Sequence, residues 1–578
     1  MKTANTLGIV VALCVTLTAG AAVALDQGSR VENFRLMDHH GASHELHYFA
    51  DSPAIVLMTH NTQCSTMPEQ LQGLSALHTQ FAPQGTQVML INSDLRDDRA
   101  AVAESVGEFD LPILLDSTQI IGEGLMAKTA GEVLVVDPSS WALAYRGGIA
   151  GASQAVTQLI AGEEVTVESE DFSSADCTVD FPELARRAEH KNISYAQSIA
   201  PMLNENCVSC HREGGIGPWA MTDYNMVRGF SLMIREVVRT QRMPPWHADP
   251  HVGEFANDRS LSDEQVRTLV HWVEAGAPRG DGPDLLAQNS QSWPVWAMGE
   301  PDVIIDIPPE DVPASGVVDY KYKMVTNPLD RDVWVKAAEI IPGNRSVLHH
   351  VITSFGELET QGRRAGRLKR GTGGGLGGYV PGAEGKPFPA DTGILLPAGA
   401  TIEFQMHYTP AGLATTDASR MGLYLYEEAP KHKLDSMILL NPRILIPAGA
   451  ANHSEVMART FDQDVLVYSL LPHAHYRGKA SEFVAHFPDG TKETLLSVPR
   501  YDFNWQTNYD LEEPRFLPAG TKMVHRTWWD NSSRNRANPD ATRDVPWGQQ
   551  SWDEMLFGSV RYRVVDAGAG QVMSGGQD

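Results

Sequence analysis

The chain has 578 residues and a formal net charge of −26 at pH 7. Domains commonly run about 100–200 residues, so this length predicts about three to five of them. The acidity argues against a nucleic-acid partner, whose phosphates need a basic surface, and it fits a soluble protein outside the cytoplasm.

The first residues have the pattern of a secretory signal peptide. Lys2 precedes an apolar run over residues 7–17, and Ala22-Val23-Ala24 offers small residues for cleavage. The run is too short to span a bilayer comfortably, and Leu13 stands where a lipid-modified Cys14 would want a small residue. We predict that residues 1–24 are cleaved, that the mature protein is periplasmic or secreted, and that it has no membrane span. An uncleaved anchor is the alternative.

Residues 27–165 alternate strand-like and helical stretches. "AIVLMTH" (54–60) and "TQVMLINSD" (86–94) read as buried strands, each followed by a helical stretch, and "EVLVVDP" with "ALAYRGG" reads as a closing hairpin. This order predicts an α/β sheet with helices on both faces. Cys64 at a strand-to-helix turn, with Pro68 just inside the helix, resembles the redoxin branch of the thioredoxin fold.

The segment also departs from that branch. A dithiol oxidoreductase has CxxC, whereas "NTQC" keeps only the second cysteine. Peroxiredoxins typically place Thr and Pro before their reactive cysteine, whereas Cys64 follows Gln63, although Thr62 is near. A helix N-terminus would lower the pKa of Cys64 and favour a thiolate. Cys177 is the other cysteine without a partner, and two such thiols usually pair in an oxidising compartment. A structural Cys64–Cys177 disulfide and a redox-active pair both stay open.

The middle of the chain carries a haem-attachment motif, Cys207-Val-Ser-Cys210-His211. Two thiols at this spacing can form thioethers to the haem vinyl groups, and the adjacent histidine can ligate the iron. A helical stretch precedes the motif. Another helix follows it, with a capping box at Ser262 and Gln265. Residues 190–285 resemble the class I c-type cytochromes.

That resemblance implies a second axial ligand from a later loop. Met243, which stands before two prolines in "RTQRMPPWHADP", is the choice, and His247 in the same loop is the rival. A methionine ligand raises the potential of the haem towards that of an electron carrier.

After residue 296 the pattern becomes all-β. Alternating runs separated by Pro-Ala-Gly and Pro-Asp-Gly turns predict two tandem, jelly-roll-like sandwiches over residues 297–428 and 433–568. Histidines gather at three points, and histidine is the commonest metal ligand. On a flat strand His349 and His350 would point to opposite faces, so one ion could hold both only if the strand twists or ends there. The three points are His349-His350, His407, and the His473-Ala-His475 pair.

The order HH, then H in "QMHYTPAG", then HxH, then a late methionine resembles the copper type II, ascorbate-dependent monooxygenases. Peptidylglycine α-hydroxylating monooxygenase and dopamine β-hydroxylase are the known members. The resemblance implies one copper on His349, His350 and His407, and an oxygen-activating copper on His473, His475 and a methionine. Met555 in "SWDEMLF" fills that position, with Met523 as the rival. The peptide- and catechol-binding residues of the family cannot be matched.

Together these resemblances predict an exported enzyme with two copper ions and one covalent haem c. It would hydroxylate a small-molecule or peptide substrate with O2. Because a haem is fused to the copper half, we expect the cytochrome to replace ascorbate as the one-electron donor, itself served by an external donor. Two alternatives are a non-catalytic copper and haem electron-transfer or copper-handling protein, and a thiol peroxidase that uses Cys64.

Overall fold

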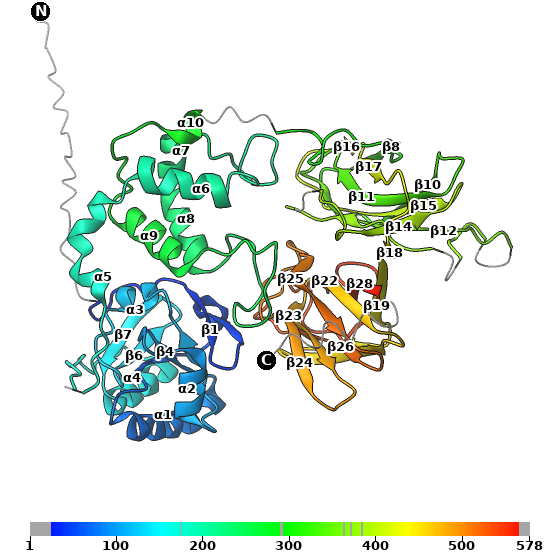
Figure 1. The fold of residues 1–578 in the computed structure, drawn as a ribbon. Coiled ribbons are helices and arrows are strands. Elements are labelled where there is room, and N and C mark those ends of the chain that lie inside the picture. Colours follow the sequence, from blue (N-terminus) through cyan, green and yellow to red (C-terminus); the bar gives the residue numbers. More distant parts are fainter. Residues whose placement is uncertain are drawn as a thin grey trace, which may run out of the picture.

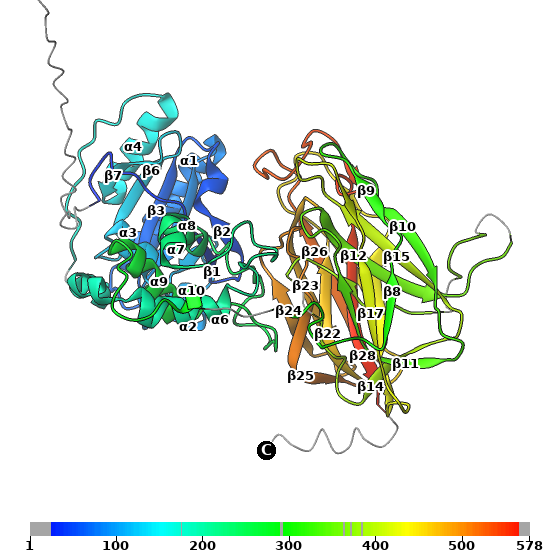
Figure 2. The same ribbon diagram turned by 90° about the horizontal axis from the view of Figure 1, so that it is seen from above.

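Four parts follow one another along the chain: an α/β part, a helical part and two parts built of β-sheets (Figure 1). The structure is a computed structural model that describes residues 25–565, apart from 175, 289–292, 362–364, 370–372 and 383–384. The predicted signal peptide, residues 1–24, lies outside the described residues. Figure 2 shows the α/β and helical parts on one side of the molecule and the β-rich half on the other.

The N-terminal part is built on a seven-stranded sheet in the order β2-β1-β5-β4-β3-β6-β7. The central strands β3, β4 and β5 are parallel, and β6 and β7 form the antiparallel hairpin that the sequence predicts. The β1–β2 hairpin was not predicted. The strands are β1 (Arg35–Asp38), β2 (Ser43–Glu45), β3 (Ile55–His60), β4 (Gln87–Asn92), β5 (Ile113–Leu115), β6 (Val133–Asp137) and β7 (Ala142–Gly147).

Helices cover both faces of this sheet, as predicted. Helix α1 (Met67–Phe81) packs against α4 (Ile149–Ala161), while α2 (Arg99–Val106) and α3 (Ile120–Leu125) lie on the other face (Figures 1 and 2). All six residues of β3 are buried, because layers on both faces exclude water from a central strand. This arrangement of sheet and helices is thioredoxin-like.

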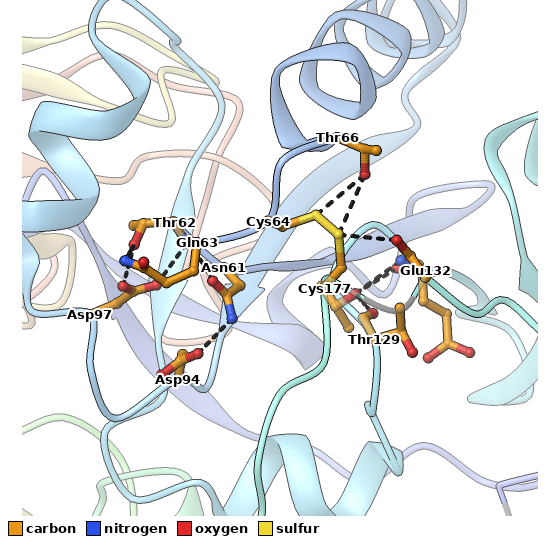
Figure 3. Close-up of a disulfide and its surroundings, with 12 residues drawn as sticks. Asn61, Thr62, Gln63, Cys64, Thr66, Asp94, Asp97, Thr129, Glu132 and Cys177 are labelled. Atoms are coloured by element: carbon orange, nitrogen blue, oxygen red, sulfur yellow. Dashed lines mark hydrogen bonds between the residues drawn. A yellow bond between two sulfur atoms is a disulfide. The ribbon is translucent and has the colours of Figure 1, made fainter.

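Cys64 and Cys177 form a disulfide in this part (Figure 3). Cys64 lies in the turn between β3 and α1, and Cys177 lies in the segment that returns after α4. Both are buried, at 3% and 0% exposure. The Thr66 hydroxyl contacts both sulfurs, and the N–H of Ala130 donates to the carbonyl of Cys177 at 2.7 Å. The bond therefore fastens the returning segment to the turn at the carboxyl end of β3.

The second part is helical. The capping box at Ser262 and Gln265 begins α9. Leu269, Val270 and Val273 of this helix are buried. Gly276, at φ +88°, follows the helix in the left-handed conformation that suits glycine. The elements are α5 (Pro182–Ala185), η3 (Arg187–Asn192), η4 (Tyr195–Ile199), α6 (Ala200–Asn206), α7 (Tyr224–Gly229), α8 (Ser231–Arg239), α9 (Asp263–Glu274) and α10 (Leu285–Gln288).

The third part pairs a four-stranded sheet, β10-β15-β12-β13, with a five-stranded sheet, β18-β14-β11-β17-β8. Their inner faces share one hydrophobic core. The strands are β8 (Val303–Asp306), β9 (Glu310–Val312), β10 (Lys321–Thr326), β11 (Val333–Ile341), β12 (Leu348–Gly356), β13 (Gly378–Tyr379), β14 (Thr392–Leu396), β15 (Thr401–Tyr408), β16 (Thr415–Asp417), β17 (Arg420–Leu425) and β18 (His432–Lys433).

The fourth part pairs the sheets β19-β28-β22-β25 and β21-β26-β23-β24. Residues of both sheets form its core. The strands are β19 (Asp435–Asn441), β20 (Leu445–Ile446), β21 (His453–Thr460), β22 (Val465–His473), β23 (Gly478–His486), β24 (Lys492–Val498), β25 (Tyr509–Leu517), β26 (Lys522–Trp529), β27 (Val545–Pro546) and β28 (Leu556–Val564). Many antiparallel sheets thus make up the C-terminal half.

The loop after α8 joins the helical part to its neighbours. Trp246 and Phe255 contribute to the core of the fourth part, and the N–H of Asp249 donates to the carbonyl of Ser497 at 2.9 Å. The carboxylate of Asp249 also pairs with Arg99 of the thioredoxin-like part at 2.7 Å. Across the described residues, the helices are all too short or too polar to cross a membrane.

The disulfide gives the first prediction. It closes a loop across 113 residues of sequence, and cross-links of this span stabilise a fold by on the order of 4 kcal/mol in the chain-entropy model. Cys177→Ser should therefore lower the urea midpoint of the thioredoxin-like part, and unreduced peptide maps of the native protein should contain the Cys64–Cys177 link. Two thiols that alkylate without reductant in the native protein would contradict this.

Candidate metal centres

A β-bulge brings the adjacent histidines of the third part together. The pairing of β12 with β15 changes register between Leu348 and His350, so the two side chains do not diverge as on a flat strand. The Nδ1 atoms of His349 and His350 lie 3.2 Å apart. His407 on β15 is the direct partner of His350 in the ladder.

These three histidines form one buried group. One ring nitrogen of each lies within 4.8 Å of those of the other two. The Nε2 of His407 is 3.2 Å from the Ser551 hydroxyl, while its Nδ1 is buried without a partner. Neutral imidazole nitrogens at this separation can converge on one ion after small side-chain rotations.

The second pair of histidines lies where β22 ends. The rings of His473 and His475 are 5.2 Å apart and both are buried. The Nδ1 of His473 contacts Gln506 Oε1 at 2.7 Å, and the Nδ1 of His475 contacts the carbonyl of Asp553 at 3.3 Å. Because each contact uses Nδ1, it orients the ring and leaves Nε2 for another ligand. The Nε2 of His475 is buried and has no hydrogen-bond partner among the described residues.

The two groups adjoin where the third and fourth parts meet. The rings of His350 and His473 are 6.0 Å apart. Phe503 of the fourth part stacks on His349, with centroids 4.7 Å apart and planes at 14°. Ser551 contacts His407 as well, so contacts across this boundary join the five rings in a single cluster.

Burial keeps the cluster neutral. It lowers the pKa of His349 and His473 to about 4 and that of His407 to about 3. Burial and neighbouring rings also hold the pKa of His350 and His475 well below the usual value. Neutral imidazole is the form that binds metal ions. Within the described part of the chain, four of the five rings have a buried nitrogen without a hydrogen-bond partner, so the donor set fits copper.

Glu554 connects the second pair to Met555. This buried carboxyl accepts hydrogen bonds from the N–H groups of His475, Arg477 and Met555 and from the Trp529 indole. Burial raises its pKa to about 7, against the effect of those N–H groups. Met555 is therefore fixed beside the histidine pair, immediately before β28.

The rival Met523 lies on β26 with no exposed surface, in the hydrophobic core of the fourth part. Packing accounts for Met523, and Met555 stays the predicted thioether ligand.

The haem motif follows α6. Cys207 and Cys210 are free, partly buried thiols. The Nδ1 of His211 contacts the carbonyl of Trp219 at 3.1 Å, which leaves Nε2 for iron. At Gly217 a Cβ atom would come within 2.8 Å of the His211 ring. The motif therefore has the thiols and the oriented histidine that covalent haem requires.

The two candidates for the second axial ligand have different settings. Met243 is partly buried just beyond α8, and its N–H donates to the carbonyl of Val237. His247 is 5% exposed, its Nε2 has no partner, and burial together with Arg500 and Arg35 holds its pKa well below the usual value.

The haem motif borders the β-rich half. A Cβ on Gly382, in the loop after β13, would lie 3.8 Å from Cys210 Sγ and 3.4 Å from the Trp505 ring. Trp505 directly precedes Gln506, which contacts His473. A short stretch of the fourth part therefore extends from the surroundings of the motif to the histidine cluster.

Sequence reasoning missed the residues that support these side chains. Gln506, Phe503 and Ser551 lie in loops without a recognisable motif, so no signal marked them. Glu554 did carry a signal, since an Asp-Glu-Met sequence is unusually polar for a strand entrance.

Comparison with known proteins places the N-terminal part. The model of the AhpC/TSA family matches residues 27–147, well under half of the chain. No curated protein matched.

Three solved structures illustrate the similarity. A hypothetical protein from Sinorhizobium meliloti 1021 is 22% identical, with 27% of this chain and 95% of that chain covered and a TM-score of 0.25. Peroxidoxin BcpB from Mycobacterium tuberculosis is 20% identical, with 24% of this chain and 97% of that chain covered and a TM-score of 0.21. A putative thiol:disulfide interchange protein DsbE from Chlorobium tepidum is 15% identical, with 24% of this chain and 98% of that chain covered and a TM-score of 0.21. The match to the family model identifies the N-terminal part as a thioredoxin-like, AhpC/TSA-type domain.

Proposed function

We propose that the chain is an exported, copper-dependent monooxygenase with its own c-type cytochrome. The observation that carries the proposal is the cluster of five neutral histidines between the third and fourth parts, of which four are buried and His349 is half-buried. Among the described residues, four of the five have a ring nitrogen without a hydrogen-bond partner. Leaving a buried polar atom unpaired costs about 1–3 kcal/mol, so a fold gains little from such a cluster unless a ligand completes it. The histidine and methionine order of the sequence agrees with copper.

Within this proposal the ligands divide into two sets. His349, His350 and His407 hold one copper, and His473, His475 and Met555 hold the other. Bound copper supplies one-electron chemistry and the activation of O2, for hydroxylation of a C–H bond. The protein's own contribution is to exclude water, to keep the imidazoles neutral and, through Glu554 and Gln506, to fix the second set.

The helical part supplies electrons in this proposal. Cys207, Cys210 and His211 hold a haem c, with Met243 or His247 as the second axial ligand. The approach of Gly382 and Trp505 to Cys210 supports delivery from this part to the copper ligands. The electrons come from an external donor, and the substrate is a small molecule or peptide.

A second candidate function belongs to the thioredoxin-like domain. Its AhpC/TSA match favours thiol redox chemistry: the Cys64 thiol would reduce peroxide to water and become a sulfenic acid, Cys177 would condense with it to give the disulfide and a second water, and an external dithiol would reduce that disulfide. The burial of both sulfurs favours a structural bond instead. If Cys64 is a peroxidatic thiol, the reduced protein should consume hydrogen peroxide and Cys64→Ser should abolish this. Consumption that survives in Cys64→Ser would exclude the role.

The haem prediction concerns covalent attachment. Because both thiols of the motif are free to form thioethers, the denatured holoprotein should keep its haem on an acid gel. Haem that extracts into acidified butanone would contradict the motif. If Met243 is the axial ligand, the ferric protein should show a weak near-infrared sulfur–iron band that Met243→Ala removes. A wild-type protein without that band, whose haem spectrum changes in His247→Ala, would assign His247.

The copper prediction uses three matched histidine variants. His473→Ala should lose one copper per chain and all substrate-dependent oxygen uptake, because it removes an oxygen-site ligand. His407→Ala should lose the other copper and turnover while it keeps the oxygen-site copper. His432→Ala, on β18 and outside the cluster, should match the wild type.

Metal analysis and electron paramagnetic resonance of the copper-loaded proteins would measure this. Equal copper content in all three variants would refute the assignment. Normal copper binding without oxygen uptake for any substrate would support the electron-transfer or copper-handling alternative.

A further inference from the structure

A second group of metal-binding side chains lies far from the copper cluster in the sequence. It combines Glu123 on α3 of the thioredoxin-like domain with Glu183 on α5, His190 on η3 and His271 on α9 of the helical part. Glu123, His190 and His271 are 8%, 7% and 3% exposed. The group therefore occupies the buried contact between two parts of the chain, and neither the haem nor the copper ligands belong to it.

The side chains are arranged in two imidazole–carboxylate pairs. The Nε2 of His190 is 3.0 Å from Glu183 Oε2, and the Nε2 of His271 is 2.8 Å from Glu123 Oε2. The two rings stack with centroids 4.1 Å apart and planes at 14°. Single ligand atoms of Glu183, His190 and His271 all lie within 4.8 Å of one another.

Protons alone satisfy this group poorly. If both imidazoles were charged, two cations would stack face to face in a buried site. If both were neutral, each Nε2–H would donate to its carboxylate, but two negative charges would remain in the site. The Arg186 guanidinium pairs with Glu183 at 3.1 Å and offsets part of that charge. A divalent cation would balance both carboxylates while both imidazoles stay neutral.

One atom points independently to a missing ligand. Glu123 Oε1 is buried and has no hydrogen-bond partner among the described residues. Buried carboxylate oxygens are normally paired, because an unpaired one bears its full cost of desolvation. The other oxygen of this carboxylate, Oε2, already contacts His271. A bound ion would therefore give Oε1 the partner that it lacks.

The group also has an entry path. A cavity of about 320 Å³ between the two parts is lined by Glu123, His190 and His271. Arg235 and Arg239 line it too, but Glu32 pairs with both and Glu274 also pairs with Arg235, so two carboxylates offset these two charges. An ion can therefore reach the group from solvent without crossing the core.

From these observations we propose that Glu123, Glu183, His190 and His271 form a binding site for a divalent metal ion of the zinc class. Two imidazoles and two carboxylates make a four-ligand set that suits zinc, and the absence of sulfur from it disfavours Cu(I). Zinc ligands lie about 3.3 Å apart when each bond is about 2 Å, so small side-chain rotations close the observed group. The ion would clamp the thioredoxin-like domain to the helical part.

The test uses the full-length holoprotein with its copper sites filled first, and Co2+ as the probe. We expect one further equivalent of Co2+ per chain, with the intense visible absorption of tetrahedral cobalt. Glu183→Gln, which keeps the size of the side chain, and His190→Ala should lose that equivalent. Two control variants should bind Co2+ as the wild type does. They are Glu189→Gln, which lies next to His190 on η3, and His251→Ala, which removes an exposed histidine.

Zn2+ should displace the cobalt and raise the thermal midpoint of the wild type but not of Glu183→Gln. His473→Ala should keep the cobalt signal, which separates this site from the copper cluster whatever the outcome there. No tetrahedral cobalt spectrum in the wild type, or an unchanged spectrum in both Glu183→Gln and His190→Ala, would overturn the proposal.

Discussion

The packing of the third part against the fourth is the interaction on which the C-terminal half depends. It gathers five imidazoles at one interface, four of them buried, and the ring centroids of His350 and His473 are 6.0 Å apart across it. Buried imidazoles without partners are costly, so this interface is poorly explained by packing alone. Bound metal ions would convert the same burial into an advantage, because burial keeps the rings neutral and ready to coordinate.

The surrounding structure serves this interface. The bulge in β12 turns His349 and His350 towards His407, and Phe503 stacks across the interface onto His349. Glu554 gathers the N–H groups of the strand end that carries His475 and of the strand entrance that carries Met555. The helical part, with its haem motif, meets the same half of the molecule at Gly382 and Trp505. Each of these contacts acts on the position or the accessibility of the predicted ligands.

Much of this organisation was predictable from the sequence, because it depends on local signals. Hydrophobic runs marked β3, β4, β6 and β7, and the capping box marked the start of α9. Spacing and order marked every predicted ligand. What could not be predicted depends on long-range geometry: a bulge that reorients adjacent histidines, loop residues such as Phe503 and Ser551, and the closeness of two histidine groups on separate sandwiches. The pairing of Glu123 with His271 likewise joins residues 148 positions apart and has no local signal.

In the proposed function, electrons pass within one chain from the haem to copper at the histidine cluster. Rapid mixing would measure this transfer, by following the haem absorption band and the Cu(II) resonance signal after ferrous haem meets Cu(II) in the same protein. The haem should reoxidise as the Cu(II) signal falls, at a rate independent of protein concentration. Haem that stays ferrous for many seconds while copper stays oxidised would contradict it.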